Sequence, residues 1–441
     1  MTGLQFTPFA GGEGDLGLIE AFMSQPNRLL VDSHHRNDSL DGLRGLAILL
    51  VIVFKFANDA LTPQSGIAER LLLYVPISGW SGVDLFFVLS GFLITGILLD
   101  AKHQTCRRYF QDFYIKRVFR ILPLYYLLCF MFFVVMPLLS RGEIRPLSTA
   151  AWYWLHLSNF FQAAGGSAGF LSVSWSLAVE EQFYLVWPLV VWYLKPRTLA
   201  RLCIAAIFAA FATRCALAFS GVHAVAIYQL TPCRIDCLAV GAWIAIGART
   251  PEAKNLVRWA NWALLVSATG LFGVIMPALV MTNDMLTGLT FHNPWVFTLG
   301  MTLNAVFFGF LLIRLLASGK ETLMHRVFMN RILRDFGKYS YCMYLTHMLI
   351  INYFHLKLQP MLEHHFGLRA ALFCGLIITC VSVYIIGALS WRFFEAPMIA
   401  MRERFIPKAT RPAPVLAEAP VVQTPVAETT IQLGGKPEPG R

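Results

Sequence analysis

Long apolar stretches recur along most of this 441-residue chain, and they constrain its fold more than any other feature. A helix needs about 20 mostly apolar residues to cross a bilayer, and somewhat fewer where neighbouring helices share the burial. The pattern therefore predicts an all-α, multi-pass membrane bundle of about ten transmembrane helices. The predicted spans lie near residues 45–57, 80–99, 119–139, 173–194, 202–219, 237–248, 259–281, 296–316, 340–355 and 371–392. A further aromatic stretch, 152–161, is expected to form a re-entrant or interfacial helix.

Composition excludes the soluble classes of protein. Hydrophobic residues make up 57% of the chain and charged residues 14%, whereas a soluble domain has about 45–50% apolar and about 25% charged residues. The formal net charge of +11 would favour nucleic-acid binding in a soluble protein. Here the basic residues lie in short loops between apolar stretches, so we expect the lipid bilayer, and no nucleic acid, as partner.

The basic residues also predict an orientation. Lys and Arg concentrate in every second loop, around 102–120, 195–201, 249–258 and 314–338, whereas the loop 282–295 has none. Because loops rich in Lys and Arg stay in the cytoplasm, both termini are expected there.

The ends of the chain differ from the apolar region. Residues 1–38 are mixed and polar and are expected to form a cytoplasmic N-terminal lead, followed by a transmembrane domain at 39–405. Residues 406–441 contain seven prolines and no apolar periodicity, which predicts a disordered tail. The nine cysteines lie mostly inside apolar stretches, where a thiol behaves as a small hydrophobe, so neither a disulfide framework nor a metal site is expected.

Charged residues inside apolar stretches are functional candidates because a bilayer makes them costly. Arg44 and Lys55 lie eleven residues apart, about 16 Å along a helix, so Arg44 is expected at the cytoplasmic rim and Lys55 well across the membrane. The alternative is that both side chains reach out to opposite interfaces. Asp84 enters its span from the same side as Lys55, where the two could form an ion pair of catalytic or purely structural value. Ser90, followed by Gly91, could instead serve close helix packing.

Two further interruptions contain groups able to move protons. Glu180 and Glu181 are adjacent and point about 100° apart on a helix, so one can face a cavity while the other contacts a neighbouring helix. Repulsion between them favours one carboxyl keeping its proton, which suits proton transfer; an interfacial pair is the alternative. His347 lies about 12 Å into its span and is either a functional residue or a packing residue.

Taken together, these motifs resemble the acyltransferase-3 family of integral membrane acyltransferases, bacterial enzymes that O-acylate cell-surface and secreted carbohydrates. The resemblance runs from about Ser39 to Pro397. It is carried by seven motifs in register: Leu40–Gly45, Gly82–Ile94, Phe113–Pro123, Trp175–Tyr184, Arg234–Asp236, Ser340–His347 and Glu395–Pro397.

The resemblance implies a multi-pass protein of the bacterial inner membrane and a reaction with two substrates. The donor would be acyl-CoA, most simply acetyl-CoA, with no permanently bound cofactor, and the acceptor a hydroxyl of a carbohydrate or glycolipid. Arg44, Arg117 and Arg120 would grip the phosphates of coenzyme A, although anchoring of a cytoplasmic loop is the alternative for Arg117 and Arg120. Asp84, Glu180 and Glu181 would lie nearer the acceptor, and an acid among them would orient the catalytic base. Ser90, Tyr184 and His347 are expected to line the pocket.

One position departs from the family pattern. The family has a histidine, the expected general base, eleven residues after the rim arginine, and this chain has Lys55 there. A protonated lysine has no lone pair to accept a proton, so impaired turnover is expected. The departure keeps open a non-catalytic homologue that binds acyl-CoA or glycan without transfer. A transporter is a weaker alternative, because no inverted repeat is evident.

Overall fold

The computed structural model describes residues 38–60, 78–140, 146–166, 169–250, 253–271 and 295–405. Within these ranges every regular element is helical, which confirms the all-α prediction. The predicted N-terminal lead (apart from Asp38), the predicted tail 406–441 and the last part of the seventh predicted span lie outside the described residues.

Each of the ten predicted ranges overlaps a helix of at least 16 residues. These are α2 (Asp38–Ala60), α4 (Gly82–Asp100), α5 (Cys106–Phe130), α9 (Ser174–Tyr193), α10 (Pro196–Phe219), α12 (Thr231–Gly247), α13 (Ala253–Ala268), α15 (Met301–Ala317), α17 (Arg331–Tyr353) and α19 (Leu368–Ser390). Shorter helices connect them: α6 (Met136–Ser140), α7 (Leu147–Trp154), α8 (Ser158–Ala163), α11 (Ala224–Gln229), α16 (Leu323–Phe328), α18 (Gln359–Phe366) and α20 (Ala396–Met401). The expected helix at 152–161 is divided between α7 and α8 by a turn at His156, whose φ is +54°.

Six helical stretches in the described part of the chain are long and apolar enough to cross a membrane: Gly79–Asp100, Cys106–Leu139, Pro196–Phe219, Ala224–Gly247, Val296–Ala317 and Leu368–Arg404. The helices α2, α9, α13 and α17 are not among them. Of these four, α2, α9 and α17 carry the charged and polar residues that interrupt the apolar pattern, such as Lys55, Glu180 and Arg334. The count of ten spans therefore stays a prediction.

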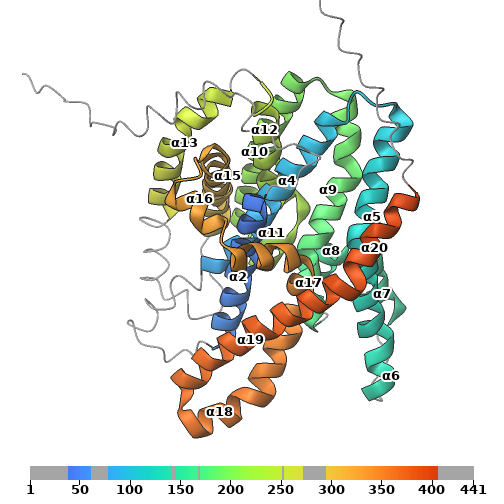
Figure 1. Cartoon of the computed structure of the whole chain (residues 1–441), viewed down its shortest axis with the longest axis vertical. Helices are drawn as coiled ribbons and strands as arrows, with labels where there is room; N and C mark the ends of the chain where they lie inside the picture. Colours follow the sequence, from blue (N-terminus) through green and yellow to red (C-terminus); the bar gives the residue numbers. More distant parts are fainter. Residues whose placement is uncertain are drawn as a thin grey trace, which may run out of the picture.

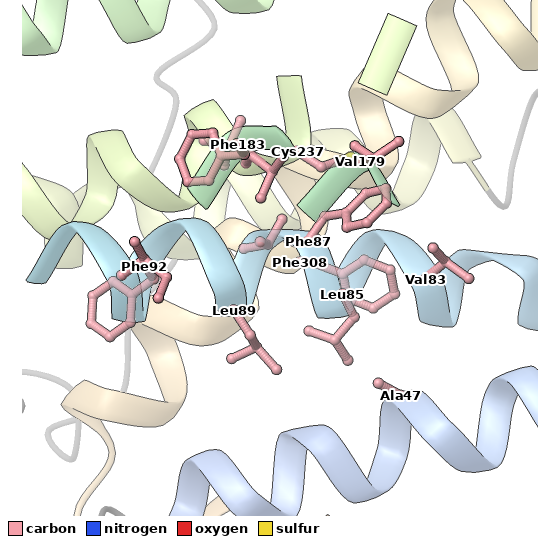
Figure 2. Close-up of a cluster of buried hydrophobic side chains, with 14 of the residues drawn as sticks. Ala47, Val83, Leu85, Phe87, Leu89, Phe92, Val179, Phe183, Cys237 and Phe308 are labelled. Carbon is pink, nitrogen blue, oxygen red and sulfur yellow. The ribbon is translucent and has the colours of Figure 1, made fainter. Parts of the chain in front are cut away.

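The helix α4 lies at the centre of the bundle. It packs against α2, α9, α12 and α15, and α4, α9, α10 and α12 run side by side in Figure 1. Figure 2 shows Leu85 of α4 directed toward Ala47 of α2, with side chains from α9, α12 and α15 around the other sides of α4. Most side chains of α4, Asp84 and Thr95 among them, are therefore buried against other helices, whereas Phe86, Ser90 and Leu93 are only partly buried.

Two close helix contacts position the site. The helix α17 packs along α2, where a Cβ atom added to Gly337 would lie only 1.7 Å from the carbonyl oxygen of Asp41. On the other side of the bundle, α4 crosses α12 at two glycines that face each other. A Cβ atom at Gly91 would lie 2.0 Å from Leu238 O, and one at Gly241 would lie 2.0 Å from Val88 O. Small residues at such crossings let helix backbones approach closely in membrane proteins.

We expect Gly91→Ala to destabilise the protein by about 1–3 kcal/mol, the usual cost of forcing a methyl group into a packed interior. The matched control is Gly96→Ala on the same helix, where the added Cβ atom meets only the end of the Arg249 side chain, at 3.0 Å. Thermal unfolding of the detergent-solubilised protein measures both. Equal midpoints for the two variants would contradict the close α4–α12 contact.

Candidate active site

A cavity of about 790 Å³, including its opening, lies between α2, α4, α5, α9 and α17. We call it the arginine cavity because three arginines line it. Its polar lining consists of Arg44, Ser90, Arg117, Arg120, Ser176, Glu180, Tyr184, Ser340, Tyr341 and Tyr344. Six of the ten residues singled out in the sequence therefore share one space.

The three arginines come from two helices. Arg44 on α2 is half-buried and forms an ion pair with Asp41, at 3.1 Å between Nη1 and Oδ1. Arg117 and Arg120 lie one turn apart on α5, and the Arg117 guanidinium lies 5.4 Å from the centre of the Tyr184 ring. Within the described ranges neither Arg117 nor Arg120 pairs with a carboxylate. The cavity therefore has positive charge available for an anionic ligand.

Ser90, Glu180 and Tyr184 form a hydrogen-bonded group in the same cavity. Ser90 Oγ donates to Glu180 Oε1 at 2.8 Å, and Tyr184 OH lies 3.1 Å from Ser90 Oγ and 3.3 Å from Glu180 Oε2. Glu180 and Tyr184 are four residues apart and so share one face of α9. Ser90 faces this cavity, whereas its neighbour Gly91 faces α12, so the two residues serve both functions considered for them.

The two residues that follow Glu180 have different surroundings. Glu181 does not line the arginine cavity, and its buried Oε1 has no hydrogen-bond partner in the described part of the chain. Gln182 Nε2 donates to His156 O and to Asn159 Oδ1, both at 3.0 Å, and so ties α9 to the α7–α8 turn. The geometry agrees with the expectation that adjacent carboxylates diverge and that only one faces a cavity.

Asp84 is paired with Arg234 and Asn304 rather than with Lys55. Arg234 Nη2 donates to Asp84 Oδ1, and Asn304 Nδ2 donates to Asp84 Oδ2 at 2.6 Å. Both members of the ion pair have fully buried side chains. The Arg234 guanidinium also lies 5.0 Å from the centre of the Tyr228 ring. This cluster links α4, α12 and α15, which is a structural role for the Arg234–Asp236 motif.

A second buried ion pair continues that role. Arg214 Nη2 lies 2.7 Å from Asp236 Oδ2, and both side chains are fully buried. Arg214 also donates to the carbonyl oxygen of Cys233 and to Thr302. The sequence analysis did not identify this partner, because Arg214 lies on a different helix, α10, 22 residues before Asp236.

A second cavity, of about 880 Å³ including its opening, contains Lys55 and His347. We call it the histidine cavity. The remaining lining consists of aromatic, aliphatic and amide side chains and one serine: Val51, Phe54, Trp80, Val83, Gln162, Ser172, Val173, Trp175, Val225, Tyr228, Gln229 and Tyr344. The close packing of α17 along α2 brings together Lys55 and His347, which lie far apart in the sequence.

The two cavities share part of their walls. Val83 and Tyr344 line both of them. Tyr344 OH lies 2.6 Å from Ser176 Oγ and 3.3 Å from the carbonyl oxygen of Val173, which fixes the ring at this boundary. Sequence reasoning did not single out Tyr344 or Ser176, although both lie within motifs that carry the resemblance. The available signal was their spacing: Tyr344 lies three residues before His347, and Ser176 lies four residues before Glu180, so each shares a helix face with a candidate residue.

Comparison with known proteins identifies the family that the chain matches. The family model described as an acyltransferase domain matches residues 37–388. The chain is 26% identical over 375 residues to the peptidoglycan O-acetyltransferase OatA of Listeria monocytogenes, a match that covers 82% of this chain and 55% of that protein. It is 25% identical over 384 residues to the O-acetyltransferase OatA of Staphylococcus aureus, covering 81% and 56%.

A shorter match is 36% identical over 171 residues to the putative peptidoglycan O-acetyltransferase YrhL of Bacillus subtilis, covering 35% of this chain and 24% of that protein. The chain thus spans about half the length of the OatA proteins it matches. No solved structure matches it. Because the family model covers most of the chain, including both cavities, the chain belongs to the acyltransferase-3 family.

Proposed function

We propose that this protein transfers an acetyl group from acetyl-CoA to a hydroxyl of a cell-envelope carbohydrate. The observation that carries the proposal is the arginine cavity, in which Arg44, Arg117 and Arg120 converge. Guanidinium groups bind phosphate oxygens through paired, charge-assisted hydrogen bonds. Coenzyme A carries several phosphate oxygens, so acyl-CoA suits the cavity as a substrate donor, with no permanently bound cofactor.

The acceptor class is supported by the relatives. OatA of Listeria monocytogenes and YrhL of Bacillus subtilis are named for O-acetylation of peptidoglycan, which makes peptidoglycan the first acceptor to test. The proposal also includes other envelope glycans with free hydroxyls, such as lipopolysaccharide, as acceptors.

We also propose a topology for the reaction. Ten helices of residues 39–405 would span the bacterial inner membrane, with both termini in the cytoplasm, as the basic loops indicate. Arg44 and Lys55 lie about 16 Å apart along α2, and each lines a different cavity. The arginine cavity would then receive the donor from the cytoplasm, and the histidine cavity would lie closer to the outer face.

Lys55 occupies the position of the base in the family pattern, so its replacement tests the function directly. We expect membranes that contain the chain to transfer labelled acetyl from acetyl-CoA to peptidoglycan, and Lys55→His membranes at matched expression to transfer it faster. An imidazole at this position can accept a proton, whereas an ammonium group cannot. Binding of acetyl-CoA without transfer by either form would identify a non-catalytic homologue. Movement of glycan across the membrane without a requirement for acetyl-CoA would identify a transporter.

A further inference from the structure

We propose that the histidine cavity is the subsite for the carbohydrate acceptor and that Nε2 of His347 accepts the proton of the hydroxyl that is acylated. This inference rests on the proposed function and assigns it a base that the resemblance does not supply. It stands on the tautomer of His347, on the unpartnered polar atoms of the cavity and on the junction with the arginine cavity.

The tautomer of His347 follows from the hydrogen bond that its Nδ1 makes to the backbone. Its side chain is fully buried, and Nδ1 lies 2.6 Å from the carbonyl oxygen of Tyr344. A carbonyl oxygen only accepts, so Nδ1 carries the hydrogen. In the neutral ring Nε2 then has a free lone pair, and it has no hydrogen-bond partner in the described part of the chain. A backbone contact that fixes the ring and leaves the other nitrogen unprotonated is what a general base requires.

Three other residues that line the same cavity each carry a buried polar atom without a hydrogen-bond partner in the described part of the chain. The atoms are Nε1 of Trp80, Nε2 of Gln162 and Oε1 of Gln229. These side chains are only 4%, 6% and 8% exposed, and buried polar groups are normally hydrogen-bonded. Gln229 Nε2 donates to Gln162 Oε1 at 3.3 Å, which orients the two amides. Among the described residues, none that carries an unpartnered buried polar atom lines the arginine cavity.

This set of atoms fits a carbohydrate. Two donors, one amide acceptor and one imidazole lone pair match a ligand whose several hydroxyls both donate and accept. The walls between them are aromatic: the Tyr228 ring lies 4.8 Å from the Trp175 ring and 6.4 Å from the Trp80 ring, centre to centre. A mostly apolar cavity with a few convergent polar groups is typical of small-molecule sites. No carboxylate lines it among the described residues.

The reaction step follows from the shared wall. The acetyl thioester would reach from the arginine cavity past Val83 and Tyr344 into the histidine cavity. The acceptor hydroxyl gives its proton to His347 Nε2 while its oxygen forms a bond to the acetyl carbonyl carbon. The carbon–sulfur bond then breaks, and the coenzyme A sulfur leaves and takes that proton from His347. The products are the acetyl ester and coenzyme A thiol, and the imidazole is again neutral.

The test compares His347→Gln with His355→Gln in membranes, using labelled acetyl-CoA and peptidoglycan. Glutamine retains an amide donor for the Tyr344 carbonyl but has no basic nitrogen. We expect His347→Gln to reduce kcat at least 100-fold, the effect of a general base, and to bind acetyl-CoA within twofold of the parent chain. His355 is the matched control, because its buried Nε2 also has no partner in the described residues but lines neither cavity. His355→Gln should keep kcat within about twofold.

Gln229→Leu tests the subsite separately from the base. We expect it to raise the acceptor KM about tenfold while kcat changes less, because it removes a contact to a part of the sugar that does not react. An unchanged acceptor KM would overturn the assignment of this cavity to the acceptor.

The remaining outcomes separate the inference from the proposed function. Transfer by His347→Gln within threefold of the parent chain would overturn the role of His347 and leave the function standing. Transfer by Lys55→His but not by the parent chain would also overturn the role of His347 and leave the function standing. It would mean that His347 does not act as a base while Lys55 is present. If neither the parent chain nor Lys55→His transfers acetyl when acetyl-CoA and peptidoglycan are supplied, the proposed function itself is overturned.

Discussion

Arg234→Met is expected to lower the free energy of unfolding by about 3–5 kcal/mol, the usual cost of removing one partner of a buried ion pair. Asp84 would keep only the hydrogen bond from Asn304, and its side chain is fully buried. The position also lies at the α4–α12 contact in the centre of the bundle, so a loosening there would affect every neighbouring helix. Denaturant unfolding of the solubilised protein measures the change.

A second ion pair, between Arg249 just after α12 and Asp100 at the end of α4, supplies the control. Arg249 binds Asp100 through two hydrogen bonds, at 2.8 and 2.7 Å, but the two side chains are 16% and 34% exposed. Arg249→Met should therefore cost about 1 kcal/mol or less. The double variant Asp84→Leu with Arg234→Met should recover most of the lost stability, because replacing both buried charges is often neutral. Equal losses for the two single arginine variants would contradict the structural role of Arg234.

Arg117→Gln is expected to raise the acetyl-CoA concentration for half-maximal transfer about 10- to 100-fold. A hydrogen bond to a charged group contributes about 1.5–3 kcal/mol, and each 1.4 kcal/mol is a factor of ten. Arg117 lines the arginine cavity and has no carboxylate partner in the described residues. Its removal therefore affects the donor phosphate without leaving an acidic side chain unpaired. Initial transfer rates over a range of acetyl-CoA concentrations measure the effect.

The control for Arg117 separates donor binding from anchoring of a cytoplasmic loop. Arg107 lies on the same helix, is exposed and does not line the cavity. Arg107→Gln removes the same charge from the same helix and should leave the acetyl-CoA dependence within about twofold of the parent chain. Similar effects of both variants on membrane insertion, with no difference in acetyl-CoA dependence, would favour the anchoring interpretation.

The helices could be predicted from the sequence because their signal is local. Each predicted span overlaps a helix, since an apolar stretch of sufficient length is visible in one continuous window. The signal is weaker in three of the five helices that line the arginine cavity. The helices α2, α9 and α17 contain charged residues and fall short of the apolar content of a membrane span, although they line the two cavities.

The candidate residues could also be identified locally, but their partners could not. Asp84 was expected beside Lys55 because both enter from one side, whereas its charge is met by Arg234, 150 residues later. That choice depends on how α4 crosses α12 at Gly91 and Gly241, a contact between backbones that no single segment encodes.

The sequence by itself determined that this protein is an all-helical member of the acyltransferase-3 family, and it determined which polar side chains interrupt the apolar helices. Only the tertiary structure decided how those side chains are grouped. It directs Ser90 and Glu180 into the arginine cavity, whereas their neighbours Gly91 and Glu181 lie outside it. It also places His347 in the same cavity as Lys55. The physical reason is that helix formation depends on residues within a few turns, whereas a cavity depends on the crossing of helices that lie up to 300 residues apart.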